Sequence, residues 1–285
     1  MNSNSRVVVI IVVLAAAAGA FLWWRRAHPT RPAAAVPSLT APVAAPTPAV
    51  PPPAPPPAAH DIRYPIERVP ARGPEESSDA YLKNLLAGLL GNKAVQSLLL
   101  TDDIAHRLVA TVNNLATDEA ASDLWPVRRT PGPFQVQGQG QGQGEAGSLG
   151  AGGTISPVNA RRYAAFVRLV DGVDAQRAAA AYVRAYPVLQ HAYEELGFTG
   201  KYLNDRVVEV IDHLLATPDV TEPPQVKRVQ APGAPAAGPD LYVFADPGLE
   251  ARSTGQKILL RVGPENEAKL KAKLTDLRQQ IARTR

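Results

Sequence analysis

The chain has 285 residues, no cysteine, one methionine, 28 prolines and a formal net charge of +4. Without cysteine it cannot form disulfides, iron–sulfur clusters, cysteine-based zinc sites or a thiolate nucleophile. Fourteen of the prolines lie between Pro29 and Pro70, so this stretch cannot build a packed core. The length leaves room for one or two domains.

The net positive charge of the chain comes from its N-terminal part. Residues 1–73 hold seven arginines and two acidic residues, a balance of +5, so the remainder carries −1. A nucleic-acid-binding protein shows the opposite distribution, because the basic surface must lie on its folded part. We therefore expect no nucleic-acid partner.

After a short N-terminal tail, residues 1–6, an uncharged run of 18 residues covers 7–24 and would span about 27 Å as a helix. It ends in two tryptophans followed by Arg25 and Arg26, a pattern typical of a membrane interface. The alternative is a cleaved signal peptide with Ala18-Gly19-Ala20 as the cleavage site, but the apolar run continues past that site. The pattern favours an uncleaved transmembrane anchor.

Residues 25–74 are predicted to be a disordered Ala/Pro-rich linker. Residues 29–60 hold a single formal charge, Arg31, and such a sequence forms a stiff, extended spacer. The arginines that flank the anchor favour a cytoplasmic C-terminal part, whereas long Pro-rich spacers are typical of proteins that reach across a periplasm. We expect a single-pass protein of the inner (cytoplasmic) membrane with a periplasmic C-terminal domain.

Residues 75–285 show the apolar periodicity of a mainly α, multi-helix globular domain, without alternating strands and helices. Thr101 is expected to cap a helix whose first turn holds Asp102 and Asp103. Pro187 is expected to kink a helix from inside. The seven expected helices start near Ser78, Thr101, Pro157, Asp174, Leu203, Leu249 and Pro264.

Two segments of this domain are predicted to be flexible insertions. The first, 137–153, begins with four Gln-Gly pairs, and the second, 221–239, is rich in proline. Leu241-Tyr-Val-Phe244, which follows, is either a short strand or a buried anchor. A formal G-x-G-x-x-G within the first segment lacks the preceding strand and following helix of a dinucleotide site, so we expect no cofactor.

Several motifs resemble an uncharacterised bacterial family, domain of unknown function 3014. They are Tyr193-Glu-Glu-Leu-Gly-Phe198, Tyr202-Leu-Asn-Asp-Arg-Val-Val-Glu-Val-Ile-Asp-His-Leu-Leu-Ala-Thr-Pro218, the segment 242–266 and, more weakly, Arg107–Leu115. The resemblance covers most of residues 78–283, and the Gln-Gly tract and residues 231–239 depart from it. It implies an N-terminally anchored protein with a Pro-rich spacer and a helical C-terminal domain, and it implies no activity.

The segment 191–213 offers a possible metal site. If its two helices form an antiparallel hairpin, His191 and Glu209 approach each other, and two His–carboxylate pairs facing across a hairpin can bind a transition metal. The candidate ligands are His191, Glu195, Glu209 and His213. The alternative, which we favour, is a solvated helix face with ion pairs such as Arg206–Glu209, so we expect no metal.

The same segment also offers a possible interaction surface, formed by Tyr193, Glu194, Tyr202, Asp205 and Asp212. Its aromatic residues suggest either a groove for a peptide or glycan or, more simply, a helical core. No signature of catalysis is present: G-x-S-x-G does not occur, Ser253 has no identifiable histidine partner, and Arg252–Lys257 falls short of a phosphate loop.

The last expected helix has two distinct faces. Leu270, Leu274, Leu277 and Ile281 keep an a/d spacing that would permit a homodimer. Three lysines, 269, 271 and 273, form a face that contacts anionic lipid or another chain or, as we prefer, is simply solvated.

We expect a non-enzymatic, membrane-tethered scaffold or interaction module that contacts envelope proteins or the cell wall. The alternative is a metal-binding or hydrolytic envelope enzyme that uses the 191–213 hairpin.

Overall fold

The computed structural model describes residues 62–66, 77–118, 124–128, 132–138, 152–229 and 241–283. Of this part, 62% is helical and 9% is in strands, which confirms the predicted mainly α class. No helix within it is long and apolar enough to cross a membrane. The predicted anchor, 7–24, and most of the predicted linker lie outside the described residues.

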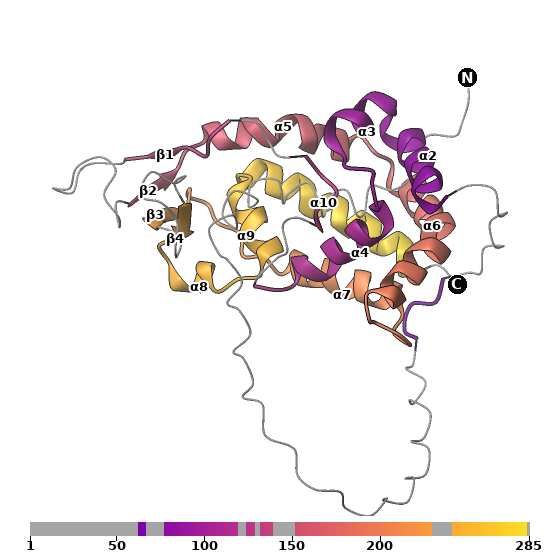
Figure 1. Ribbon diagram of the computed structural model, residues 1–285. Coiled ribbons are helices and arrows are strands. Elements are labelled where there is room, and N and C mark those ends of the chain that lie inside the picture. Colours follow the sequence, from indigo (N-terminus) through magenta and orange to yellow (C-terminus); the bar gives the residue numbers. More distant parts are fainter. Residues whose placement is uncertain are drawn as a thin grey trace, which may run out of the picture.

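Nine helices and four strands occur among the described residues (Figure 1). In chain order they are α2 Ser78–Leu90, α3 Asn92–Leu98, α4 Ile104–Leu115, β1 Val136–Gln137, β2 Gly152–Ile155, α5 Val158–Asp171, α6 Ala175–Glu195, α7 Leu203–Leu215, β3 Gln225–Val229, β4 Leu241–Phe244, α8 Pro247–Glu250, α9 Thr254–Arg261 and α10 Pro264–Ile281. The helices pack together, and the strands form a small sheet at one end of them.

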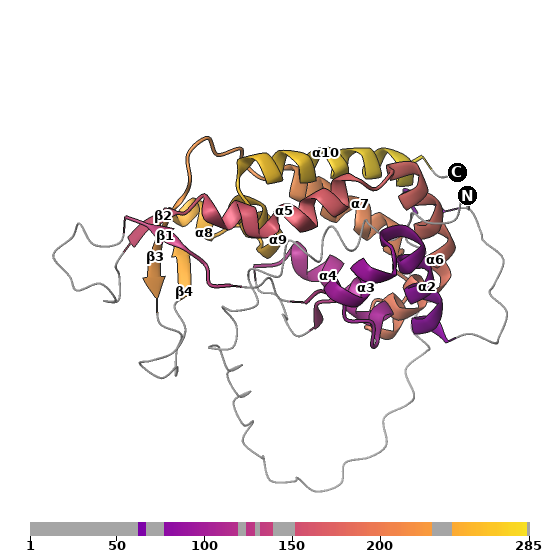
Figure 2. The same cartoon turned by 90° about the horizontal axis from the view of Figure 1, so that it is seen from above.

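The C-terminal helix α10 lies along α5 and α7 (Figure 2) and also contacts α6. Its four a/d residues are each at most 1% exposed: Leu270, Leu274, Leu277 and Ile281. The apolar spacing that suggested a homodimer therefore serves the core of this chain. A second chain would have to contact another face of the helix.

Lys273 of α10 is buried and Lys271 is half-buried, contrary to the solvated face that we preferred. The Lys273 ammonium donates to the Val173 carbonyl just after α5, and the Lys271 ammonium donates to the Thr217 carbonyl just after α7, both at 2.7 Å. Carbonyl groups at helix C-termini carry partial negative charge, so each lysine stabilises a helix end. Lys269 is exposed, as expected.

The four strands pair in the order β1-β2-β3-β4, each antiparallel to its neighbour. A small second core lies between the sheet and α9 and consists of Ile155, Val226, Phe244 and Leu260. Because direction alternates along the sheet, the connections from β1 to β2 and from β3 to β4 leave from the same end.

Both predicted flexible insertions contribute strand residues that the sequence did not predict, at Gln137 in β1, at 152–153 in β2 and at 225–229 in β3. In β3, Val226 is buried between exposed Gln225 and Lys227, the alternation of a half-buried strand. In β2, a Cβ on Gly153 would lie 2.3 Å from the Gln137 carbonyl oxygen, so only glycine fits beside β1. The segment 241–244 is the strand β4, one of the two predicted alternatives.

Helix α4 begins differently from the prediction. Its N-cap is Asp103, in a left-handed conformation with φ 51°, and no side chain of its own turn caps it. Instead, the Asp79 carboxylate of α2 accepts the N–H groups of Asp103 and Ile104 at 2.8 and 3.0 Å. A neighbouring helix thus supplies the hydrogen-bond acceptor that the expected cap, Thr101, was to provide locally, and it adds a negative charge at the start of α4.

The predicted single helix 249–262 is divided into α8 and α9. Ser253 begins α9 and accepts the Gln256 N–H at 3.3 Å. A Cβ on Gly255 would lie 2.4 Å from the Leu214 side chain and 2.7 Å from the Leu115 carbonyl oxygen. This glycine therefore allows α9 to pack closely against α4 and α7.

Candidate functional site

A cavity of about 950 Å³ lies beside the hairpin of α6 and α7. Its walls come from both helices, their connecting turn, the C-terminal end of α4 and the two residues Ile62 and Arg63. The lining has three aromatic rings (Tyr193, Phe198, Tyr202), three basic groups (Arg63, Lys201, Arg206) and three acidic groups (Glu194, Asp205, Glu209). We call this site the hairpin groove. Its formal charges balance.

The turn between α6 and α7 shapes one wall of the groove. Gly197 and Gly200 have φ of 94° and 75°, values that glycine adopts without strain. The Phe198 N–H donates to the Tyr193 carbonyl, and the two rings stack with centroids 4.5 Å apart at 11°. The Lys201 ammonium lies 5.6 Å from the Phe198 centroid. The turn thus presents an aromatic surface with a cation beside it.

Gln190 fixes this turn to α6. Its amide nitrogen donates to the Lys201 carbonyl and to the Glu194 carboxylate, each at 2.8 Å. Its amide oxygen accepts the Leu203 N–H and the Tyr186 hydroxyl, also at 2.8 Å. One side chain therefore makes hydrogen bonds to four groups, and these bonds hold the groove wall in a preformed structure.

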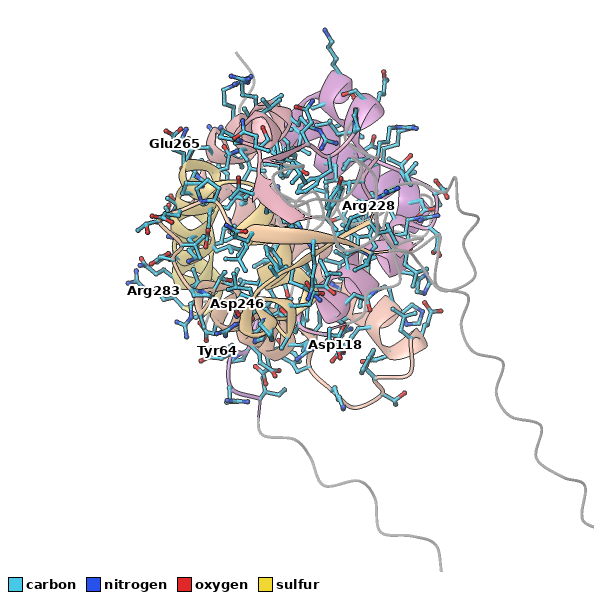
Figure 3. All side chains as sticks on the ribbon, turned by 90° about the vertical axis from the view of Figure 1, so that its left-hand side faces the viewer. Tyr64, Asp118, Arg228, Asp246, Glu265 and Arg283 are labelled. Atoms are coloured by element: carbon cyan, nitrogen blue, oxygen red, sulfur yellow. The ribbon has the colours of Figure 1, made fainter. Side chains whose placement is uncertain are left out.

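Residues 62–66, which we call the strap, lie within the predicted linker, and two of them, Ile62 and Arg63, form part of the rim of the groove. The Asp205 carboxylate accepts the N–H groups of Arg63 and Tyr64 at 3.1 and 2.8 Å. The Tyr202 hydroxyl accepts the Ile66 N–H at 2.7 Å, and the Asn204 amide donates to the Tyr64 carbonyl at 2.8 Å. The prediction of linker up to residue 74 is therefore wrong for the strap. In Figure 3, Tyr64 lies at the lower edge of the molecule.

Four of the five predicted interaction residues line the hairpin groove: Tyr193, Glu194, Tyr202 and Asp205. The fifth, Asp212, does not line it, because its carboxylate pairs with the Arg278 guanidinium, with Nη2 to Oδ2 at 2.8 Å. The sequence interpretation missed Gln190 and the strap. Phe198 belonged to a motif that we quoted, and its half-buried ring forms part of the aromatic wall.

The four candidate metal ligands are not brought together. Glu195 lies 3.4 Å from the Nε2 of His191, whereas Glu209 pairs with Arg206 at 3.0 Å, and His213 contacts Ser253. Within the described ranges, no group of three or more His, Asp or Glu side chains is placed to hold a metal ion. The Arg206–Glu209 ion pair named as the alternative is present.

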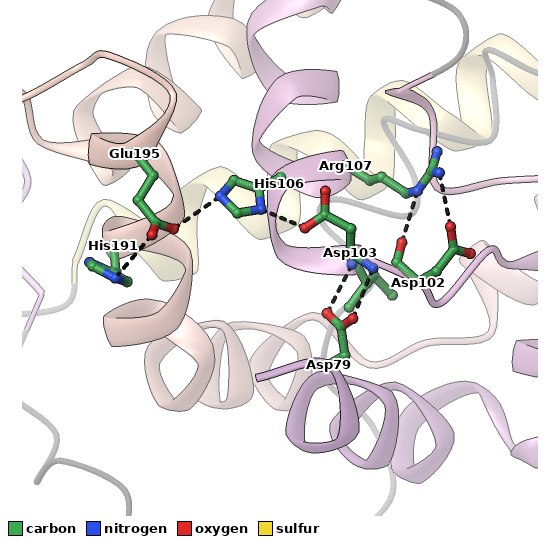
Figure 4. Close-up of polar contacts among 8 residues, drawn as sticks. Asp79, Asp102, Asp103, His106, Arg107, His191 and Glu195 are labelled. Carbon is green, nitrogen blue, oxygen red and sulfur yellow. Dashed lines mark hydrogen bonds and ion pairs between the residues drawn. The ribbon is translucent and has the colours of Figure 1, made fainter. Parts of the chain in front are cut away.

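Sequence reasoning missed a histidine in this region. His106 of α4 lies between two carboxylates, with Nδ1 2.5 Å from Asp103 and Nε2 3.0 Å from Glu195 (Figure 4). These contacts, with Asp103 contributing most, raise the pKa of His106 above its ordinary value of 6.5. The His106 ring thus links the start of α4 to the end of α6.

The expectation that Ser253 has no histidine partner is wrong. The Nε2 of His213 lies 2.8 Å from the Ser253 hydroxyl, which also accepts the Gln256 N–H as the cap of α9. Burial, followed by the charge of Arg206, lowers the pKa of His213, which favours a neutral ring that accepts from the hydroxyl. A catalytic triad requires a carboxylate that is hydrogen-bonded to the histidine ring. In the described part of the chain, no carboxylate is hydrogen-bonded to the His213 ring. The Ser253 hydroxyl of this pair caps the start of α9.

The profile of a family described as "Protein of unknown function (DUF3014)" matches residues 104–278. The chain belongs to this family. The predicted resemblance is thereby confirmed. The DUF3014 region extends from the start of α4 into α10 and includes the whole hairpin, whereas the strap, α2 and α3 precede it. No curated protein and no solved structure matches the chain.

Proposed function

We propose that this DUF3014 protein is a non-enzymatic docking module whose hairpin groove binds an extended, uncharged, proline-rich or otherwise apolar peptide segment. The module is tethered to the inner membrane by residues 7–24 and meets its protein partners in the periplasm. The observation that carries the proposal is a preformed, partly aromatic, charge-balanced groove whose carboxylates are engaged in contacts within the protein.

The wall of the groove suits a peptide. The rings of Phe198 and Tyr202 are half-buried, a cation lies next to Phe198, and apolar side chains and proline rings pack on such aromatic faces. Because three basic and three acidic groups balance, the groove favours neither a strongly acidic nor a strongly basic segment. A preformed turn also lowers the entropic cost of binding.

The carboxylates of the groove are already engaged within the protein. Glu194 accepts from the Gln190 amide, Asp205 holds the strap, and Glu209 pairs with Arg206. A general acid or base must be able to exchange a proton with substrate, and a glycan would need these same oxygens for its hydroxyl groups. This arrangement favours a peptide over a glycan and binding over hydrolysis.

A peptide titration tests the proposal. Fluorescent ten-residue peptides, one uncharged and proline-rich, one acidic and one basic, would be titrated against the purified full-length chain by anisotropy. We expect the uncharged peptide to bind best, and Phe198→Ala to weaken it about tenfold, because an aromatic contact contributes on the order of 1.4 kcal/mol.

The matched control is Phe134→Ala, which truncates a partly buried ring beside the sheet, far from the groove. It should leave peptide affinity unchanged. The proposal is wrong if a charged peptide binds better than the uncharged one, or if Phe198→Ala and Phe134→Ala have equal effects.

A further inference from the structure

We propose that the hairpin groove is occupied by a segment of the same chain, Pro51–Pro57, and that a partner binds by displacing it. The proposal rests on the proposed function, because it names the first occupant of the same groove. On this proposal the protein's own segment fills the groove until a competing segment of a partner replaces it.

The place where the described chain begins brings this segment within reach of the groove. Ile62, at 51% one of the most exposed large apolar side chains in the described part, lines the groove together with Arg63. Both residues belong to the strap, which is held in place where the Asp205 carboxylate accepts the Arg63 N–H and the Tyr202 hydroxyl accepts the Ile66 N–H. Pro57 is five residues before Ile62, so at about 3.1–3.6 Å per residue it lies within roughly 18 Å of the rim.

The chemistry of the segment fits the groove. Residues 51–57 are six prolines and Ala54, and no Asp, Glu, Lys or Arg occurs from 32 to 60. Proline-rich segments dock on aromatic grooves because their extended conformation is already restricted in the free chain. They have carbonyl acceptors but almost no N–H donors, and Arg63 and Lys201 provide donors at the groove.

The covalent connection makes even a weak contact effective. A segment attached through a short linker is present at an effective concentration in the millimolar range. A groove that is filled nine-tenths of the time by its own segment binds a free competitor about tenfold more weakly than an empty groove.

A comparison of two full-length chains tests this inference. One is the natural chain, and in the other Pro51–Pro57 are replaced by seven Gly and Ser residues. The probe is a fluorescent peptide of sequence Pro-Pro-Pro-Ala-Pro-Pro-Pro. We expect the replaced chain to bind the probe about tenfold more tightly, and Phe198→Ala in that chain to abolish the gain. Replacing residues 32–38 instead, as a control, should leave the affinity as in the natural chain.

The outcomes separate the two proposals. Equal, Phe198-dependent binding to both chains would overturn self-occupancy and leave the proposed function intact, whereas binding to neither chain would overturn both. A photoreactive residue at position 54 identifies the occupant directly: a crosslink to residues 193–206 of the same chain supports the inference. A crosslink that joins two chains would show that a second copy fills the groove and would overturn it.

Discussion

The Asp205 carboxylate accepts the backbone N–H of Tyr64 at 2.8 Å and so joins the first turn of α7 to a residue 141 positions earlier in the chain. An aspartate in the first turn of a helix usually serves the N–H groups of that helix. Here it holds the strap. The N-terminal residues therefore join the domain at α7, beside the hairpin groove, and not only at the start of α2.

Asp205→Ala should release the strap. Two backbone N–H groups lose a charged acceptor, and we expect the free energy of unfolding to fall by about 1–3 kcal/mol in a urea titration. Asp276→Ala, which alters an exposed aspartate of α10, is the matched control and should stay within about 0.5 kcal/mol of the natural chain. Equal effects of the two substitutions would show that the strap contributes nothing to stability.

His106 should make the protein more stable in mild acid. Its folded-state pKa lies above 6.5, so its contribution is complete below pH 6.5 and disappears as the pH rises through the folded-state value. We expect the natural chain to exceed His106→Gln in unfolding free energy most clearly near pH 6. Asp103→Asn, which removes the main cause of the shift, should reduce this advantage. A difference that grows with rising pH would contradict the assignment.

His213 should make the protein less stable in mild acid, the opposite of His106. Its folded-state pKa lies below 6.5, because the ring is partly buried against Ser253 and near Arg206, with Arg252 also lowering the value and Glu209 opposing it. The unfolded chain takes up a proton at 6.5 and the folded chain does not, so stability is lost as the pH falls below 6.5. The natural chain should lose this stability relative to His213→Gln, as measured by thermal unfolding between pH 7.5 and 5.5. A constant difference over that range would refute the shift.

Lys273→Met should lower the free energy of unfolding far more than Lys269→Met. The first substitution keeps the apolar stem but leaves the Val173 carbonyl without its buried donor, at a cost of about 1–3 kcal/mol. The second alters an exposed lysine four residues earlier and should change stability by less than about 0.5 kcal/mol. Urea unfolding of both variants measures this, and similar values would mean that the Lys273 contact is unimportant.

Most helices could be predicted because their apolar residues recur with the period of the structure they form, as Leu270 to Ile281 do in α10. The contacts that were missed join residues distant in sequence. Asp79 caps α4 from another helix, Ser253 meets His213 across 40 positions, and the strap docks on residues about 140 positions later. No local pattern reveals such pairs.

In the candidate site, too, the residues close in sequence could be predicted and the contacts between distant residues could not. Tyr193, Glu194, Tyr202 and Asp205 are close in sequence around one turn, so their gathering could be predicted. The metal hypothesis failed because it needed the relative rotation of two helices: Glu195 turns toward His106 of α4, whereas Glu209 lines the hairpin groove. Periodicity gives the faces of a helix but not the neighbour that each face meets.

The shared direction of the two sheet connections has a practical consequence. The strand ends that these connections join belong to the sheet, which lies at the end of the molecule away from the turn between α6 and α7 (Figures 1 and 2). Doubling the length of such a connection costs only about 0.6 kcal/mol in closure entropy. A fluorescent reporter or affinity tag spliced between β1 and β2, or between β3 and β4, would therefore label the protein while leaving the hairpin groove accessible.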